Sequence, residues 1–434
     1  MRGYRDLFRT PELTPLFLST AAQTVAQTAS GLALGTLVYR STGSPLLSAV
    51  SMFGPSLAQV LGATLLLSGA DRLPPRRTLA GISLAFAALT ALLALPGLPL
   101  GAVFAVVLVQ GLVASLGGGV RWGLLNEILA KDEAKGGTNG EAKGGTNGEA
   151  KGGANGEANG GTHGGANGGY LLGRSVFNMM SGIMQITGYA TGGALVAALS
   201  PRVSLLLAAV LYAVAAAGVR LGLSRRTPRS SGRPSVTATW RTNAVLWRDR
   251  PRRLTYLGLW LPNGLVVGCE SLYVPYAPGA AGTLFACAAL GMLAGDVTVG
   301  RLLPPVVRRR AATPLLALLA APYLLFALRP PVAVAACLVA LASVGFGASL
   351  VQQERLMSLT PPGLSGHALG LHSAGMLTTQ GVGAALAGTA AQLTSPAVAM
   401  TGTAAASAAV TLALAVAPGV APAEADRRGE PALR

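Results

Sequence analysis

Two carboxyl side chains lie inside long apolar stretches of the sequence, where they could carry protons. Glu270 lies about sixteen residues into a stretch near 254–274, and Asp296 lies at a similar depth in the next stretch. A charged group at the centre of a bilayer span costs about 2.5 to 3.5 kcal/mol on insertion scales, so it usually faces a cavity or a partner. Both carboxyls are therefore candidates for proton coupling. A hydrated acid near the membrane surface is the alternative for Glu270, and a structural pair with a basic neighbour is favoured for Asp296.

Amide and aromatic side chains in other apolar stretches could bind a substrate. Gln23 and Gln27 are one helical turn apart, and Gln59 lies in the middle of the next stretch. Trp260 and Asn263 share a helix face with the first of the two carboxyls. Unpaired amides are costly in hydrocarbon, so these side chains should point inward. They could hydrogen-bond a substrate or only another helix, and both interpretations stay open.

These side chains require helices that cross a membrane to position them. Runs of about twenty mostly apolar residues, enough to cross a hydrocarbon core of about 30 Å as helix, can be placed at twelve points. They lie near 14–39, 45–68, 78–96, 99–122, 171–198 and 203–223, and then near 254–274, 279–300, 312–328, 331–350, 366–394 and 396–418. The chain is therefore predicted to be an all-α integral membrane protein with both termini on one side.

The distribution of basic residues predicts the orientation of these spans. Of the 33 Lys and Arg residues, all but Arg40, Arg202 and Arg329 fall on one side. The positive-inside rule places that side, with both termini, in the cytoplasm. Basic clusters beside apolar spans favour contact with anionic lipid over binding of nucleic acid. A composition rich in Ala, Gly, Leu and Arg is typical of a high-GC bacterium, so the bacterial cytoplasmic membrane is the expected location.

A low-complexity tract separates the fourth and fifth predicted spans. The eight residues Lys-Gly-Gly-Thr-Asn-Gly-Glu-Ala begin at Lys135, recur at Lys143, nearly recur at Lys151 and recur in decayed form from Asn159. A tract without apolar residues buries too little surface to offset its chain entropy. Residues 135–169 are therefore predicted to form a disordered cytoplasmic loop.

The two halves of the chain repeat one another. The pattern Gln-x-x-Gly-x-Ala-x-x-Gly-x-x-x-x-x-x-Ser-Pro begins at Gln185 and again at Gln380, at an offset of 195. Arg72-Leu-Pro-Pro likewise resembles Arg301-Leu-Leu-Pro-Pro, at an offset of 229. This offset is larger than 195 because the low-complexity tract lies between Arg72 and Arg301 but not between Gln185 and Gln380. Parallel repeats of six helices are typical of one class of membrane proteins. The sequence predicts two pseudo-symmetric six-helix bundles (1–134 with 170–223, and 254–418), a basic linker (224–253) and a cytoplasmic tail (419–434).

Layout and local motifs together resemble the major facilitator superfamily, particularly its bacterial exporter-like branches, over essentially all of 10–420 apart from the tract. Residues 41–44, Ser-Thr-Gly-Ser, are similar to a turn of this branch, and residues 69–77 are similar to the family's loop between helices two and three. That loop holds an inner gate in the family, across the seam between the halves at the end of helix eleven. The resemblance implies the same role here for Asp71, Arg72, Arg76 and Arg77, with a simple basic turn as the alternative.

The sequence departs from exporters of this family at two motifs. Val107 stands where the family has an arginine linked to proton coupling, and Tyr189 stands where drug–proton antiporters have a proline. With few charges in the spans, the resemblance still implies a secondary transporter that exports a small amphipathic or apolar organic compound, such as a drug or secondary metabolite, with proton antiport as one form of coupling. Uptake or facilitated movement of a small solute is one alternative. A membrane scaffold or sensor that has lost transport is another.

Nothing in the sequence indicates an enzyme. Neither a nucleotide-binding loop, nor a metal-ligand constellation, nor a nucleophile with a nearby base occurs in the chain. We therefore expect no cofactor, and the family's usual state predicts a monomer. Three cysteines, Cys269, Cys287 and Cys337, lie inside predicted spans and are expected to be small apolar core residues.

Overall fold

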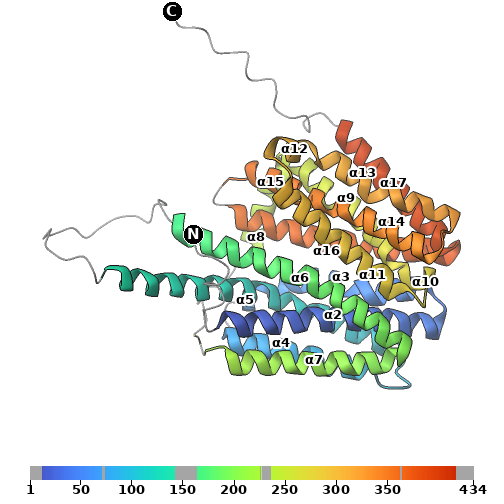
Figure 1. Cartoon of the computed structure of the whole chain (residues 1–434), viewed down its shortest axis with the longest axis horizontal. Coiled ribbons are helices and arrows are strands. Elements are labelled where there is room, and N and C mark those ends of the chain that lie inside the picture. Colours follow the sequence, from blue (N-terminus) through green and yellow to red (C-terminus); the bar gives the residue numbers. More distant parts are fainter. Residues whose placement is uncertain are drawn as a thin grey trace, which may run out of the picture.

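The computed structural model describes residues 12–70, 74–141, 164–224, 226, 236–361 and 364–416, and every regular element within these ranges is a helix (Figure 1). Six long helices form the N-terminal half. They are α2 (Leu13–Thr42), α3 (Pro45–Ala70), α4 (Pro75–Leu93), α5 (Leu100–Glu141), α6 (Gly164–Ala198) and α7 (Pro201–Gly222).

Local turn chemistry explains where several of these helices begin and end. The chain leaves α2 at Gly43, whose φ of 65° favours glycine. Proline opens α3, α4 and α7, where its missing N–H would have had no helical partner. At α7 the Ser200 side chain also accepts a hydrogen bond from the backbone N–H of Val203, at 3.2 Å.

The C-terminal half follows a short helix, α8 (Val236–Arg248), which lies within the predicted basic linker. Several of its membrane-crossing segments contain a change of helix type or a break. The elements are α9 (Arg250–Ser271), α10 (Tyr273–Tyr276), α11 (Ala281–Val297) continued by the π-helical η1 (Thr298–Leu302), α12 (Pro305–Arg310), α13 (Ala312–Leu324) continued by η2 (Leu325–Leu328), α14 (Val332–Val344) joined through η3 (Gly345–Gly347) to α15 (Ala348–Ser358), α16 (Ser365–Leu393) and α17 (Pro396–Val416).

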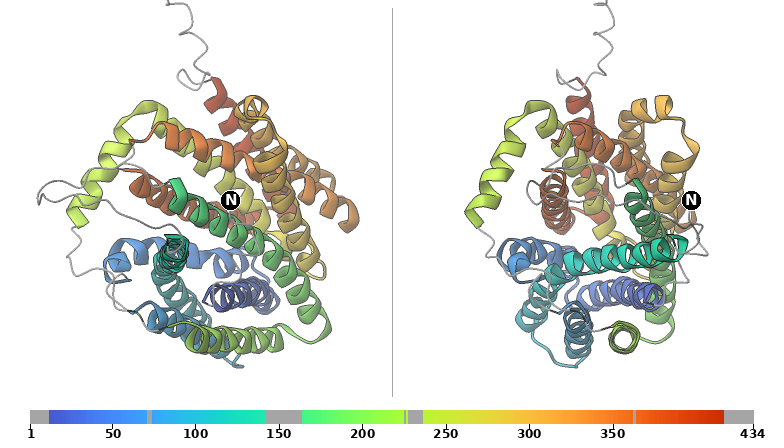
Figure 2. Two further views of the ribbon diagram at one scale, coloured as in Figure 1. Left: turned by 60° about the vertical axis from the view of Figure 1, so that its left-hand side comes forward. Right: turned by 90° about the vertical axis from the view of Figure 1, so that its left-hand side faces the viewer.

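The two halves form two adjacent helix bundles, as Figures 1 and 2 show. By length and apolar composition alone, seven of the described helices could cross a membrane. The remaining long segments include α2, α9 and α16, which carry many of the polar side chains considered below and pack among the apolar ones. The prediction of an all-α membrane protein with two six-helix bundles is confirmed.

The long helices run between two ends of the molecule, the basic end and the far end. The basic end holds α8 and α12, and the far end holds α10 and the turn between α2 and α3 (Figure 1). The halves meet along two seams, where α6 packs against α11 and α3 packs against α16. Ser44 donates a hydrogen bond to Gln392 Oε1 at 2.8 Å across the second seam at the far end.

The duplicated sequence pattern corresponds to these two seams. Its last glycine is Gly193 in α6, where a Cβ would lie 2.7 Å from Gly282 Cα of α11. The equivalent Gly388 in α16 faces α3, and a Cβ there would lie 2.8 Å from Leu46 Cα. Both glycines therefore let helices of opposite halves approach closely near the far end.

The low-complexity tract differs from its prediction at both ends. Helix α5 continues to Glu141 and α6 begins at Gly164, so 135–141 and 164–169 are helical. Each residue added to an existing helix gains a backbone hydrogen bond without a new nucleation cost, which explains extension into a weak helix-forming sequence. Residues 142–163 lie outside the described part of the chain.

Candidate functional site

Glu270 is buried near the far end, on α9, with 6% of its surface exposed. Its Oε1 atom has no hydrogen-bond partner among the described residues. Three tyrosines lie within electrostatic range of its carboxyl: Tyr273 and Tyr323 of the same half, and Tyr189 of α6 in the other half. A carboxyl without a cationic neighbour is thus enclosed next to the seam between the halves.

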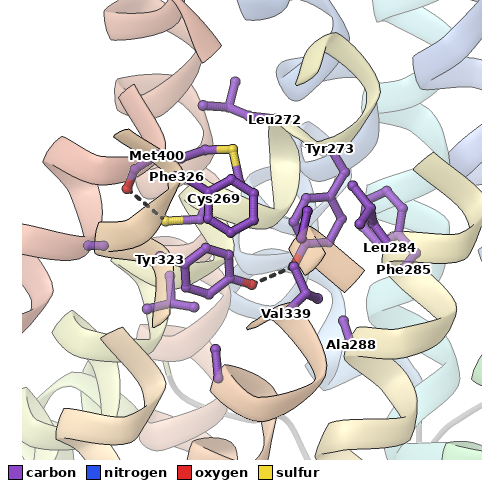
Figure 3. Close-up of a cluster of buried hydrophobic side chains, with 14 of the residues drawn as sticks. Cys269, Leu272, Tyr273, Leu284, Phe285, Ala288, Tyr323, Phe326, Val339 and Met400 are labelled. Carbon is purple, nitrogen blue, oxygen red and sulfur yellow. Dashed lines mark hydrogen bonds between the residues drawn. The ribbon is translucent and has the colours of Figure 1, made fainter. Parts of the chain in front are cut away.

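Glu270 lies beside an apolar cluster that contains side chains of both halves. Tyr273 and Tyr323 hydrogen-bond through their hydroxyls, and Cys269 donates to the carbonyl oxygen of Met400 at 3.3 Å (Figure 3). Tyr189 of α6 stacks on Phe285 of α11, with ring centroids 4.7 Å apart. Leu32, Met52 and Phe53 of the N-terminal half pack against the same cluster.

Water is excluded from this carboxyl because both halves cover it. A buried carboxyl can be charged only at a large desolvation cost unless a cation or several donors compensate it. The described neighbours of Glu270 supply no cation and no hydrogen bond to Oε1.

A second polar cluster lies inside the N-terminal half, in the third of the bundle near the basic end. Arg121 of α5 donates a hydrogen bond to Gln23 Oε1 of α2, and Gln23 Nε2 donates to Ser83 Oγ of α4. Gln23 is therefore bonded to two neighbouring helices in this conformation. The sequence did not single out Arg121, although an arginine at the end of an apolar run, like a carboxyl within one, is costly to place in hydrocarbon without a partner.

The aromatic and amide pair predicted on α9 packs against α16 instead of facing open space. Trp260 Nε1 donates to the backbone carbonyl of His372 at 3.1 Å, and its ring covers Gly375, where a Cβ would overlap it. Asn263 Oδ1 accepts from Gln380 Nε2 at 3.2 Å. Both side chains are less than a tenth exposed. Helix contacts therefore occupy the polar atoms of both side chains in this conformation, and their role as substrate ligands stays a prediction.

The remaining predicted positions are spread over the bundle. Gln27 is exposed and Gln59 is partly buried. Asp296 is exposed two residues before the π-helical η1, and none of the ion pairs found among the described residues includes it. The prediction that Asp296 forms a structural pair therefore has no support here. Of the cysteines, Cys269 is buried as expected, whereas Cys287 is partly exposed and Cys337 is exposed.

Only part of the predicted inner-gate motif lies in the described structure. Asp71 and Arg72 fall outside it. Arg76 donates to the backbone carbonyl of Arg220 at the end of α7, a bond within the N-terminal half, and Arg77 is exposed. Arg76 thus satisfies a carbonyl at a helix C-terminus, where cations are favoured.

Further basic side chains tie together the helix ends of each half. Arg226 pairs with Glu12 and, at 3.0 Å, with Glu127, while its side chain is only 9% exposed. In the other half, Arg252 donates to the carbonyl of Leu359 at 2.9 Å. Each of these contacts joins elements of one half only.

Comparison with known proteins places the fold but not the family. No family model matches the chain, and no curated protein sequence matches it. Among solved structures, a POT family transporter in complex with a thioalcohol-conjugated peptide shares 11% identity, with a TM-score of 0.68 over 93% of this chain and 95% of that one. The nucleoside transporter NupG shares 13%, with a TM-score of 0.67 over 93% and 98%.

A bacterial homologue of the human lysosomal transporter Spinster, in an inward-facing and occupied conformation, shares 12% identity, with a TM-score of 0.62 over 96% of this chain and 97% of that one. Each of these likenesses spans both halves. The chain therefore has the fold of these membrane transporters, which is the major facilitator fold predicted from its layout.

Proposed function

We propose that this chain is a secondary transporter that works by alternating access, with its two bundles rocking about the seams that join them. The observation that carries the proposal is the buried carboxyl of Glu270, which lies at the seam of both halves with no cationic partner among the residues that the structure describes. A group in that position changes its exposure to water whenever the halves part. Transport and proton binding would then be coupled through one movement.

The orientation follows from the basic residues. With the basic end in the cytoplasm, the far end is external, and the close contacts at Gly193 and Gly388 seal the external side. A closed external side is what an inward-facing conformation requires. Asp71 and Arg72 belong to the proposed inner gate, which forms when the basic ends come together.

The proposed cargo is a small amphipathic or apolar organic compound, such as a drug or secondary metabolite, moved outward in exchange for protons. Three described polar side chains that could have bound a polar substrate, Gln23, Trp260 and Asn263, are already hydrogen-bonded to other helices. This leaves mainly apolar side chains to contact a substrate, which favours an apolar or amphipathic compound. A strongly ionic substrate would require fixed counter-charges, and few are available. We place the protein as a monomer in the bacterial cytoplasmic membrane, with its basic loops in contact with anionic lipid.

The test measures accumulation of labelled lipophilic antibiotics and dyes in an efflux-deficient bacterial host, with and without a protonophore. Cells with the wild-type chain should accumulate less than cells with an empty vector, and the protonophore should abolish the difference. Glu270→Gln should lose this gradient dependence. Glu354→Gln is the matched control, because Glu354 is a half-exposed carboxyl at the basic end, paired with Arg308 at 3.2 Å.

Each outcome bears on a separate part of the proposal. If Glu270→Gln retained the wild-type response to the protonophore, the coupling role would be wrong while transport stood. If wild-type cells matched the empty vector for every compound, and Asp71→Asn changed nothing, export would be refuted. Uptake of a small solute or a scaffold role would then be the better description.

A further inference from the structure

A groove runs along the outside of the α6–α11 seam near the far end. It has a volume of about 410 Å³ and apolar walls that include Ile186 and Ala190 from α6 and Ala286 and Leu290 from α11. Ala190 and Leu290 are exposed along its length, so the groove opens sideways from the bundle. The α11 wall belongs to a helix long and apolar enough to cross a membrane, and the α6 wall lies within the predicted span 171–198. The groove should therefore face the hydrocarbon of the bilayer.

A second, smaller pocket continues the groove toward the membrane surface. The two share Gly193, Ala197, Gly279 and Gly282, and the smaller one adds the side chain of Arg40 in the last turn of α2. Arg40 is exposed, and neither an ion pair nor a side-chain hydrogen bond is found for it in the described part of the chain. It is also one of only three basic residues predicted at this end of the spans.

We propose that this composite site binds one phospholipid from the leaflet at the far end, with an acyl chain in the groove and the phosphate at Arg40. Charge complementarity selects this occupant: an apolar channel at hydrocarbon depth ends at an isolated cation at headgroup depth. Basic pockets between membrane helices bind lipid headgroups, and each buried methylene adds to the affinity. The inference does not depend on the transport activity proposed above.

The lipid would also favour the conformation described here. The groove and the smaller pocket both include Gly193 and Gly282, which touch only while the far end is closed. A ligand that binds one of two conformations shifts the equilibrium toward it. Bound phospholipid should therefore stabilise the far-end seam.

The test uses native mass spectrometry of the full purified chain titrated with phosphatidylglycerol. Wild type should retain one lipid more tightly than the rest. Arg40→Gln should weaken that retention about five- to tenfold, as expected for a partly exposed ion pair with help from the pocket. Ala190→Leu, which fills the groove from an exposed position, should weaken it about tenfold through lost methylene contacts.

Arg202→Gln is the matched control, since Arg202 is exposed at the same end on α7, away from the groove. A second readout is modification of Cys287, which lines the groove, by N-ethylmaleimide in a Cys337→Ser background. Lipid should slow this reaction, and Arg40→Gln should require about five- to tenfold more lipid for the same protection. Equal retention by all four proteins, or no protection of Cys287, would show annular lipid only and would overturn the proposal.

Discussion

Replacement of Gly193 by alanine tests whether the far-end seam is a gate held closed by close helix packing. A Cβ at Gly193 would lie 2.7 Å from Gly282 Cα, and the reverse distance, from a Cβ at Gly282 to Gly193 Cα, is 2.5 Å. Carbon atoms in good contact are about 3.5 to 4.0 Å apart, so α6 and α11 must separate by about 1 Å. Neither partner is a flexible side chain that could turn away. The clash therefore acts on the closed conformation.

The size of the effect follows from the cost of overpacking. Inserting a methyl group into a tight contact costs about 1 to 3 kcal/mol. The cost is absent once the helices part, and the gain in helix propensity from glycine to alanine applies to both conformations. Since 1.4 kcal/mol corresponds to a factor of ten, the ratio of open to closed molecules should rise about five- to 150-fold.

Thiol accessibility measures this ratio. Thr36 is 1% exposed and lines the pocket formed with Gly193 and Gly282, so Thr36→Cys reports opening at the far end. With Cys287 and Cys337 replaced by serine, a charged thiol reagent should react faster in Gly193→Ala by the factor above. Gly402→Ala is the control, because Gly402 lies within α17 and a Cβ there meets no atom within 4 Å. Equal reaction rates in the two alanine variants would refute the reasoning.

Three further changes test other contacts. Arg226→Gln should lower the free energy of unfolding by about 1 to 3 kcal/mol, because it removes two partly buried ion pairs; an unchanged Tm in detergent would contradict this. Gln23→Ala removes the described acceptor of Arg121 and should cost about 1 to 3 kcal/mol, again read as Tm. A double-mutant cycle of Ser44→Ala and Gln392→Ala should give a coupling of at most about 1 kcal/mol, since the bond is exposed.

The helices and their pairing into two bundles could be predicted because both depend on local or repeated patterns. Apolar runs, proline at the first helical turn and glycine at Gly43 are readable one segment at a time. The repeated pattern that begins at Gln185 and Gln380 predicted that the two bundles are related by pseudo-symmetry. The structure shows which contacts the repeated residues make. In each copy the last glycine allows close contact with the other half, while Gly383 in the second copy packs on Gly264 within its own half.

The faces of the inner helices could not be predicted in the same way. A membrane helix such as α9 is packed on several sides, so sequence spacing groups Trp260 with Glu270 without saying which neighbour each one meets. The structure directs Trp260 toward α16 and encloses Glu270 near Tyr189 of the opposite half. Sequence spacing could not pair Arg121 with its acceptor, because Gln23 lies 98 residues away in the chain.

Helices α5 and α6 are much longer than a bilayer requires. At about 1.5 Å per residue, the 42 residues of α5 extend about 63 Å, which is about 33 Å longer than the hydrocarbon core of a bilayer. The helix projects past the bundle at the basic end (Figure 1). A tilt of about 10° at the bilayer would displace such a tip by about 5 Å, which amplifies a small rotation into a measurable translation. A rotation of the N-terminal half would therefore produce its largest displacement at the ends of these two projecting helices. Fluorophores placed near their ends would test the proposed rocking movement without changing the seams or the buried carboxyl.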